Sequence, residues 1–243
     1  GVDPPPRPSP PPAEEPAGKT EDVPFKPVAT DLVQMEASAK GFLEAPTWQD
    51  AFRWVYLPEK VRPKAEAWYA ARPYKTPGFK ETSVEPIVLP IGESEIDVVG
   101  LDVQTADYVD RQLALVRTPE GYRVDWESWA GWSESSWEDF KKERPTEPKL
   151  FRVMCSPTTY YNFSFKDEAE WVSFRLESPE RDEFLYGYSP VGDVLTARLS
   201  PLDGIKERSV ILKLRFPAGA ETDNQVIIDG IVGTGWVDLP ANP

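Results

Sequence analysis

The chain has 243 residues, of which 40% are hydrophobic and 12% are aromatic, so it can bury a core and is not disordered throughout. Its formal net charge of −14 repels a phosphate backbone, and its longest basic run is Lys141–Lys142, so we expect no nucleic-acid partner. Histidine is absent and Cys155 is the single cysteine, which removes the commonest general base, the commonest transition-metal ligand and any internal disulfide.

Residues 1–30 contain ten prolines and few apolar side chains, which predicts an extended, polyproline-like linker. The stretch Pro5–Pro8 has the PxxP spacing of ligands for proline-recognising domains. A stalk that holds the folded part away from a membrane is the interpretation we favour, because PxxP spacing arises easily in such a composition. We therefore expect a periplasmic or other extracytoplasmic location, with membrane contact only through an anchor upstream of Gly1.

Three helices are predicted after the linker. Thr30 or Asp31 is the candidate N-cap of the first helix, and apolar residues follow it at helical spacing. Thr47 is a candidate N-cap for a second helix. Pro63 interrupts the next stretch, which predicts a short turn before it and a third helix over residues 63–72.

Alternation of apolar and polar residues then predicts a meander of about four antiparallel strands. The strand-like segments are residues 83–90, 94–105, 107–118 and 122–131. A tight turn at Pro119–Gly121 joins the last two of these segments.

This order of helices followed by long strands, with the hairpin "RTPEGYRVDW", resembles the NTF2-like (SnoaL-like) superfamily over roughly residues 31–143. The resemblance extends to uncharacterised bacterial proteins with a proline-rich N-terminal linker. It implies an α+β cone, in which helices pack on a curved antiparallel sheet around a pocket. That superfamily includes isomerases, dehydratases and binding modules, so the resemblance alone implies no one activity.

A second unit is predicted over residues 148–239, after an NTF2-like domain over residues 31–147. Its order is three strands, a short helix in residues 191–202 and two further strands, which is typical of an OB-like or another small β-barrel. Residues 160–165 read as one of the strands, with alternate aromatic side chains in the barrel core. The aromatics of this unit are also candidates for a stacking platform: Tyr160, Tyr161, Phe163, Phe165, Tyr186 and Tyr188.

Residues 123–140 combine four tryptophans with five carboxylates, which suits either a carbohydrate cleft or a buried scaffold. If the strand continues, Trp126 faces the core, and Trp129 lies on the other face with Asp125 and Glu127. We favour the scaffold, because a glycosidase needs two carboxylates opposed across a cleft, and neighbours on one strand are not opposed.

A short helix is predicted after this strand. Ser135 or Ser136 is its candidate N-cap, and Ser135 has the spacing of a capping box with Glu138. Trp137 and Phe140 lie one turn apart and clamp this helix to its domain.

Six residues are the candidate ligand-binding set of a cone pocket: Tyr56, Tyr69, Arg111, Asp125, Trp129 and Trp132. We expect the Arg111 guanidinium to extend to the rim, because a charge on a buried face needs an anionic partner.

Cys155 is interpreted as a buried, inert thiol, since no histidine is present to activate it. We assign no catalytic residue, metal site or cofactor.

We interpret the chain as a non-catalytic binding or assembly module for a protein, peptide or glycan partner. An NTF2-like small-molecule enzyme, of isomerase or dehydratase type, is one alternative, and it requires a pocket carboxylate and a tyrosine within hydrogen-bond reach. A carbohydrate-binding protein is the other, and it requires an exposed ring at Trp129 or Trp132.

Overall fold

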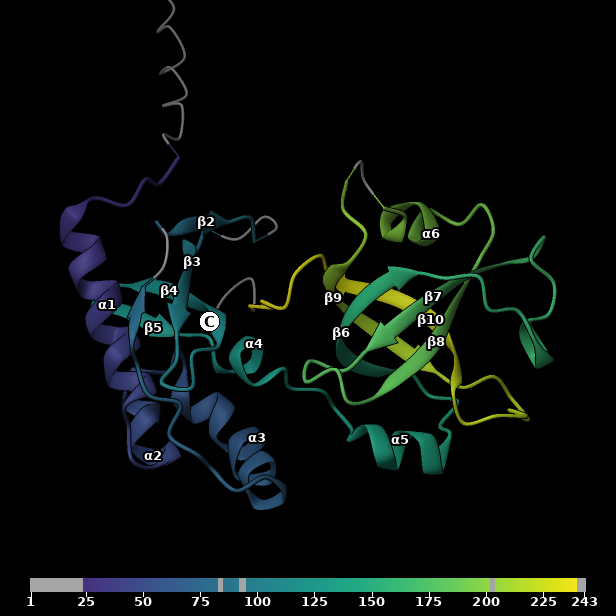
Figure 1. Cartoon of the computed structure of the whole chain (residues 1–243), viewed down its shortest axis with the longest axis horizontal. Helices are drawn as coiled ribbons and strands as arrows, with labels where there is room; N and C mark the ends of the chain where they lie inside the picture. The colour runs from purple at the N-terminus through teal and green to yellow at the C-terminus, as the bar shows by residue number, and fades with distance from the viewer. Residues whose placement is uncertain (1–23, 83–84, 92–94, 202–203, 240–243) are drawn as a thin grey trace, which may run out of the picture.

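The computed structural model of the chain describes residues 24–82, 85–91, 95–201 and 204–239. The predicted linker falls mostly on residues 1–23, so it lies, with its PxxP stretch, outside the described residues. Figure 1 shows two lobes side by side, a helix-and-sheet lobe at the left and a barrel lobe at the right. Among the described residues, no helix is both long and apolar enough to cross a membrane.

The first lobe begins with α1 (Ala29–Leu43), α2 (Trp48–Ala51), a 3-10 turn (Phe52–Trp54) and α3 (Pro58–Ala71). Thr47 caps α2 as predicted, because its hydroxyl accepts the N–H of Asp50 at 3.1 Å. The predicted N-cap of α1 at Thr30 or Asp31 is wrong by two or three residues, because the N-cap is Val28. Asp31 lies inside the first turn and accepts the N–H of Val28 at 2.8 Å, so the helix begins before it.

The predicted break before Pro63 is also wrong, because α3 is one helix from Pro58 onward and Pro63 lies inside it. Pro58 occupies the first turn, where its missing N–H would have no partner in any case. Pro63 removes one helical hydrogen bond, a cost that the packing of Val61, Ala65 and the following aromatic residues against the core offsets. Tertiary packing therefore overrides the local signal.

The sheet is antiparallel and consists of β1 (Glu81–Thr82), β2 (Ile87–Leu89), β3 (Val98–Gln104), β4 (Asp110–Thr118) and β5 (Gly121–Val124). Both β1 and β2 pair with β3, which pairs with β4 along its whole length. The tight turn predicted at Pro119–Gly121 joins β4 to β5, with Thr118 opposite Gly121.

Both faces of this sheet are covered, which explains the runs of consecutive apolar residues in β3 and β4. One face, which includes Leu101 and Leu113, packs against the helices in the main core. The other face presents Val98, Ala114 and Val116, and Val237 and Leu239 from the C-terminal end of the chain pack against it together with Tyr56 and residues of β2 and its flank.

The predicted continuation of the strand through the tryptophans is wrong. The strand β5 ends at Val124, and the chain turns into a short helix, α4 (Trp126–Ala130). Asp125 is the N-cap of α4, since its carboxylate accepts the N–H of Ser128 at 3.3 Å. Helical spacing of i, i+3 places Trp126 and Trp129 on one side, and both are buried in the main core.

The second lobe is a closed barrel of five strands in the order β10-β8-β7-β6-β9. Its strands are β6 (Lys149–Pro157), β7 (Trp171–Glu177), β8 (Phe184–Pro190), β9 (Arg208–Arg215) and β10 (Gln225–Gly233). The pair β8 and β10 is parallel, and the other pairs are antiparallel. The short helix predicted in residues 191–202 is present as α6 (Val194–Leu199).

Two further elements pack on the barrel. The helix α5 (Trp137–Glu143) has Ser136 as its N-cap, with the N–H of Asp139 donating to the hydroxyl at 3.1 Å. Of the two predicted caps, Ser136 is confirmed, and Ser135 with its capping box is wrong. Its Trp137 and Phe140 belong to the barrel core, and Phe140 lies 4.6 Å from the Phe151 ring centre.

The strand predicted over residues 160–165 is wrong. This stretch is a loop that contains a 3-10 turn, Phe163–Phe165, and Asn162 caps that turn. Phe165 is buried, Tyr161 is partly buried and Phe163 is 43% exposed, so the three aromatics do not share a core face.

As expected, Cys155 is a buried free thiol, and burial raises its pKa to about 12.

Arg152, a fully buried residue of β6, holds the two lobes together. Its guanidinium donates to the carbonyls of Trp236 (2.8 Å) and Trp132 (2.9 Å) and to the Glu127 carboxylate (3.3 Å). The Trp236 indole in turn donates to the carbonyl of Val153 at 3.1 Å. One barrel side chain therefore connects α4, the segment after it and the C-terminal segment (residues 234–239).

Candidate functional site

The interior of the predicted cone is filled with side chains. The Trp126 indole, fully buried, donates to the Tyr69 hydroxyl at 3.1 Å. Tyr69 stacks on Trp48 with ring centres 5.6 Å apart. The Tyr74 hydroxyl donates to the Ala45 carbonyl at 3.0 Å. The hydroxyls of these two tyrosines are therefore hydrogen-bonded to an indole and to a backbone carbonyl, and not to a carboxylate.

The six predicted cone residues do not form one site. Asp125 caps α4, and Tyr69 lies against Trp126 in the core. Tyr56 lies on the opposite face of the sheet, where it packs in the cluster around Val98. The structure thus separates Tyr56 from the other predicted residues, and it uses Asp125 and Tyr69 in hydrogen bonds of the scaffold.

Cations cover the two remaining predicted rings. The Arg111 guanidinium lies 3.5 Å from the Trp129 ring centre and donates to the Trp129 carbonyl at 2.6 Å. The Lys64 ammonium lies 4.1 Å from the Trp132 ring centre and pairs with Glu127. Trp129 is only 7% exposed, so its ring offers no open face for a sugar.

Asp125 has an unusual environment for a carboxylate. It is buried at the junction of the lobes, and this burial raises its pKa to about 6 from an ordinary 3.8, while the Ser128 hydrogen bond and Arg152 oppose the rise. Because the folded protein holds this proton more tightly than the unfolded chain does, the stability falls as the pH rises from about 4 to about 6 and stays at the lower value above pH 6.

We expect Asp125→Asn to raise the stability at pH 8, by up to roughly 3 kcal/mol for a pKa difference of about two pH units. Asparagine is also a good N-cap, so α4 is retained. The gain should vanish as the pH falls through 6 towards 4. Urea unfolding at pH 8 and pH 4.5 measures it, and an equal gain at both values would contradict this account.

Asp31→Asn is a contrasting variant for the same measurement. The N–H of Val28 and the hydroxyl of Tyr122 donate to the Asp31 carboxylate and lower its pKa. The ionised form is therefore the stabilising one, and it is present above the ordinary pKa and lost at lower pH. We expect Asp31→Asn to lower the stability at pH 8, with the opposite sign to Asp125→Asn.

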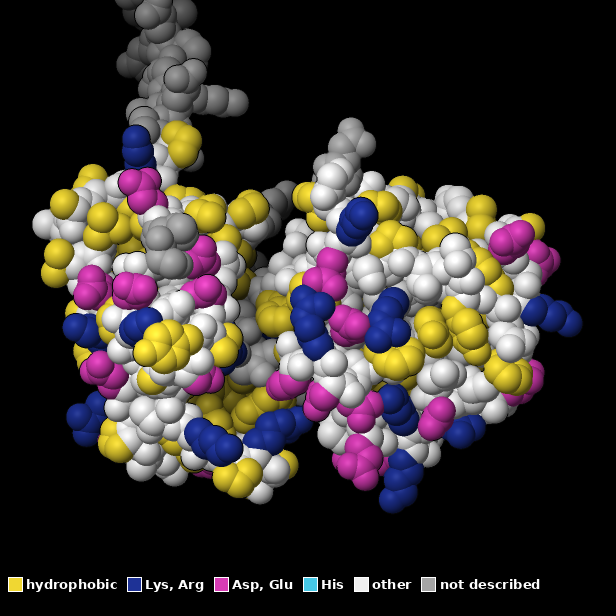
Figure 2. Space-filling view, in the orientation of Figure 1, with side chains coloured by type: hydrophobic (Ala, Val, Ile, Leu, Met, Phe, Trp, Pro, Cys, Tyr) yellow, Lys and Arg dark blue, Asp and Glu magenta, His cyan; other side chains and the backbone are white. Residues whose placement is uncertain are grey.

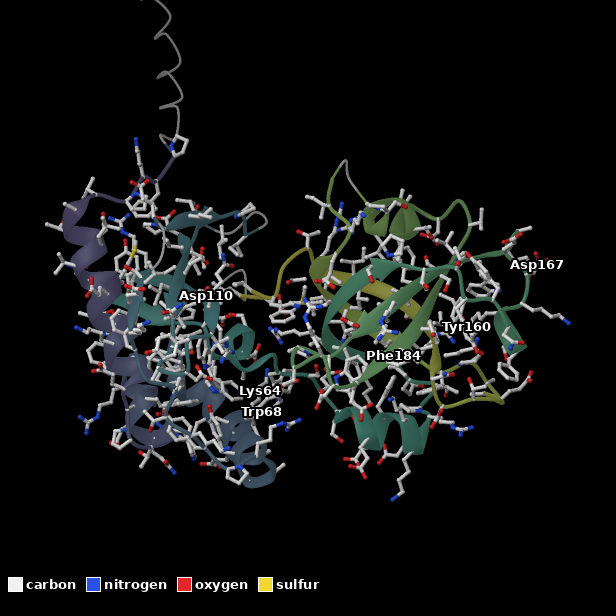
Figure 3. All side chains as sticks on the ribbon, in the orientation of Figure 1. Lys64, Trp68, Asp110, Tyr160, Asp167 and Phe184 are labelled. Carbon is white, nitrogen blue, oxygen red and sulfur yellow. The ribbon has the colours of Figure 1, made fainter. Side chains whose placement is uncertain are left out.

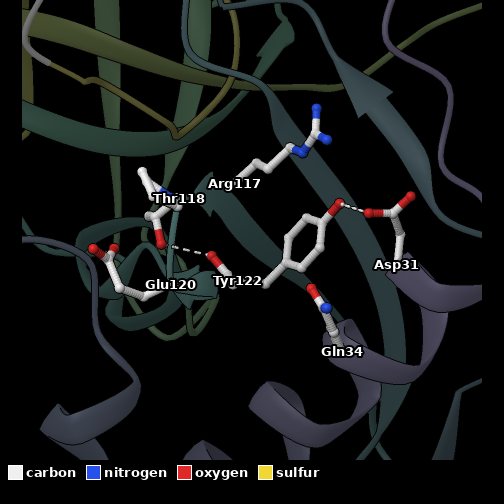
Figure 4. A pocket seen from close by; sticks show the side chains of 8 residues that line it. Asp31, Gln34, Arg117, Thr118, Glu120 and Tyr122 are labelled. Carbon is white, nitrogen blue, oxygen red and sulfur yellow. Dashed lines mark hydrogen bonds between the residues drawn. The ribbon is translucent and has the colours of Figure 1, made fainter.

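A polar hollow of about 680 Å³ lies beside the turn between β4 and β5 (Figure 4). The Tyr122 hydroxyl donates to Asp31 at 2.8 Å, which is the one carboxylate–tyrosine pair seen here within hydrogen-bond reach. The pKa of Asp31 is lowered and that of Tyr122 is raised by burial and by Asp31. Proton transfer near neutral pH needs the opposite shifts, so this pair acts as a structural hydrogen bond.

An aromatic strip on the outer surface of the barrel is the candidate site. We use this name for Tyr160, Phe184 and Tyr186. Tyr160 stacks on Tyr186 with ring centres 4.1 Å apart and planes at 22°. Phe184 meets Tyr186 edge to face at 5.4 Å and 82°. All three side chains are partly exposed, although Arg175 covers one face of the Phe184 ring.

Strand geometry places the strip. Phe184 and Tyr186 are two residues apart in β8, so both point away from the barrel core into which Leu185 points. Figure 2 shows hydrophobic side chains on the face of the barrel turned to the viewer, and Figure 3 locates Tyr160 and Phe184 on that face.

One end of this row of rings is already closed. Tyr188, the next outward residue of β8, is buried under Phe165, with the two rings parallel at 4.1 Å. The Tyr188 hydroxyl donates to the Tyr160 carbonyl at 2.8 Å. The loop after β6 therefore folds over Tyr188 and fixes Tyr160 above Tyr186.

The charges beside the strip are mutually paired. The Arg175 guanidinium lies 3.8 Å from the Phe184 ring centre and pairs with Glu177 at 2.9 Å. Arg181 pairs with Glu177 and with Glu207. The aromatic strip thus has a nearly neutral border, which provides no cationic track for a phosphate backbone.

Sequence reasoning proposed a platform of six aromatics in this lobe, and the structure brings two of them, Tyr160 and Tyr186, into the strip. It missed Phe184, whose signal was the alternation in "FLYGY". It also missed Arg152 and Trp236, since neither lies in a recognisable motif. Among the described residues no cluster of acidic residues and Cys155 is suited to a metal ion.

No family model matches the chain, and no curated protein or solved structure matches it either.

Proposed function

We propose that the chain is a non-catalytic binding or assembly module, whose barrel takes an extended peptide segment of a partner protein on the aromatic strip. The observation that supports this proposal is the row of rings formed by Tyr160, Phe184 and Tyr186, which are partly exposed and pack against one another. These rings can contact a ligand with little loss of side-chain conformational entropy on binding, because their packing and the loop after β6 already restrain them.

We further infer that the first lobe is NTF2-like and the barrel OB-like. For the barrel, the support is its strand order: numbered within the lobe, the pairing runs 1-2-3-5-4-1, with strands 3 and 5 parallel and α6 between strands 3 and 4. For the first lobe, it is the order of three helices before an antiparallel sheet. The domain division at residues 147 and 148 is part of this proposal.

A peptide ligand is favoured over the two rivals. The enzyme alternative finds little support, because the tyrosines of the first lobe are paired within the core and the Asp31–Tyr122 pair has unsuitable pKa shifts. The carbohydrate alternative rested on rings that Arg111 and Lys64 now cover. The location we propose is outside the cytoplasm, with the proline-rich linker as a tether, on composition alone.

Selection of random twelve-residue peptides displayed on phage, against the immobilised full chain, tests this function. We expect enriched peptides whose binding falls at least tenfold on Tyr186→Ala, since an anchor ring of this kind is worth about 2 kcal/mol. Tyr108→Ala is the matched control, because Tyr108 is 71% exposed on the first lobe. The proposal fails if no peptide is enriched or if the enriched peptides bind Tyr186→Ala equally well.

A further inference from the structure

We propose that the ligand of the aromatic strip is the proline-rich stretch of a second copy of this chain, residues 4–12, so that copies associate head to tail. This inference rests on the proposed function, since it names the partner of the same surface. Four observations support it, and they concern the barrel edges, the rings, the charges and the position of α1.

The barrel has no edge strand that is free along its whole length. Each of its five strands pairs with two neighbours, although β8 meets β10 over only three residues and β6 meets β7 over only four, so an added strand would find little unpaired backbone. An extended ligand must then be recognised through its side chains. Proline suits this requirement, because it lacks the N–H that a strand ladder needs and its ring presents a ready apolar surface.

The rings suit a polyproline helix. Aromatic-lined grooves bind such helices by packing proline rings against aromatic rings. Phe184 and Tyr186 are in edge-to-face contact, with ring centres 5.4 Å apart. A polyproline helix rises about 3.1 Å per residue, so residues two apart are separated by about 6 Å, which is close to this ring spacing.

The composition of residues 4–12 complements the border of the strip. The stretch "PPPRPSPPP" has seven prolines and a single charge, Arg7. The turn that precedes Phe184 is Glu180–Glu183, in which Arg181 and Glu183 form salt bridges with residues outside the turn. Glu180 and Asp182 are exposed and can meet a cation on the ligand.

The position of α1 favours a second copy. The described chain begins at Pro24, next to α1, and Figure 1 shows α1 on the side of the first lobe that faces away from the barrel. A donor segment that leads into α1 and an acceptor on the barrel are different surfaces, so they give a heterologous contact, which builds rings or open chains of copies.

Fluorescence anisotropy of a labelled peptide of residues 1–16 against the full chain tests the recognition. We expect saturable binding that weakens at least tenfold with Tyr186→Ala, and likewise with Tyr160→Ala, whose side chain lies in a loop and not in the barrel wall. The control variant Tyr108→Ala should bind as the unaltered chain does. A peptide with all seven prolines of residues 4–12 replaced by alanine should not bind. Absence of binding, or equal binding by both strip variants, overturns the inference.

Sedimentation equilibrium of the full chain tests the second copy. We expect the average mass to rise with concentration beyond that of a dimer, and to return to the monomer value with excess peptide or with Tyr186→Ala. A monomer at every concentration overturns the head-to-tail contact even where the peptide binds. If the phage selection yields strip-dependent peptides that lack proline, this inference fails while the proposed function stands.

Discussion

Arg152→Met is expected to lower the free energy of unfolding by about 3–5 kcal/mol, the usual cost of removing one partner from a buried charged network. The guanidinium is fully buried and satisfies two carbonyls and one carboxylate. Methionine fills a similar volume but donates no hydrogen bond. The carbonyls of Trp132 and Trp236 then lose their donor, and Glu127 keeps only Lys64.

Lys213→Met is the matched control for this change. Lys213 lies on β9, next to β6 in the barrel, and its pair with Glu134 is long, at 3.4 Å, and partly exposed. Exposed pairs contribute about 0–1 kcal/mol, so this variant should unfold almost as the unaltered chain does. Urea unfolding followed by tryptophan fluorescence measures both. A loss below 1 kcal/mol at Arg152 would show that water replaces its hydrogen bonds without cost.

Truncation after Gly233 is expected to cost roughly 4 kcal/mol and to loosen the contact between the lobes. It removes the Trp236 carbonyl that Arg152 binds and the indole hydrogen bond to Val153. It also removes Val237 and Leu239 from the sheet face. Each partly buried aliphatic side chain contributes about 1 kcal/mol and each net hydrogen bond about the same, which gives this magnitude.

Truncation after Leu239 is the control, because it keeps every contact of residues 234–239 described above. Thermal unfolding by calorimetry compares the two chains. We expect one transition for the control, and for the shorter chain either a lower transition or two transitions, since the lobes then lose a common element. Identical melting of both chains would contradict a role for the C-terminal segment in holding the lobes together.

In the proposed module, the contacts of Arg152 and of residues 234–239 stabilise the fold, whereas the aromatic strip binds the ligand. The Arg152 network and the C-terminal segment hold the barrel against the sheet, whereas the strip lies on the barrel surface at partly exposed residues of β8 and of the loop after β6. Variants of the strip should therefore change binding with little change in stability, and variants of the network should do the reverse. This contrast separates loss of a ligand contact from loss of the fold.

Local sequence patterns by themselves determined several features of this protein. Alternation and a turn of the type Pro-Glu-Gly predicted the β4–β5 hairpin, and Thr47 predicted the cap of α2. The order of strands and one short helix predicted a small barrel in the second half. Such features depend on residues close in the chain, so their signals are periods, caps and turns that a sequence displays directly.

Other features depended on tertiary contacts. The stretch around Trp126 and Trp129 suits a strand or a short helix by spacing, and burial of both rings in one core favoured the helix. Pro63 stayed within α3 because the packing of that helix exceeds the loss of one hydrogen bond.

The contacts that join the lobes, and those that order the strip, were decided by the tertiary structure alone. Arg152 and Trp236 are 84 residues apart, and Tyr160 meets Tyr186 only because β7 and β8 bring a loop and a strand together. The physical reason is that the periodicity and the capping of a segment depend on residues close in sequence. The burial of a side chain and its ionic partners depend on residues that are close in space.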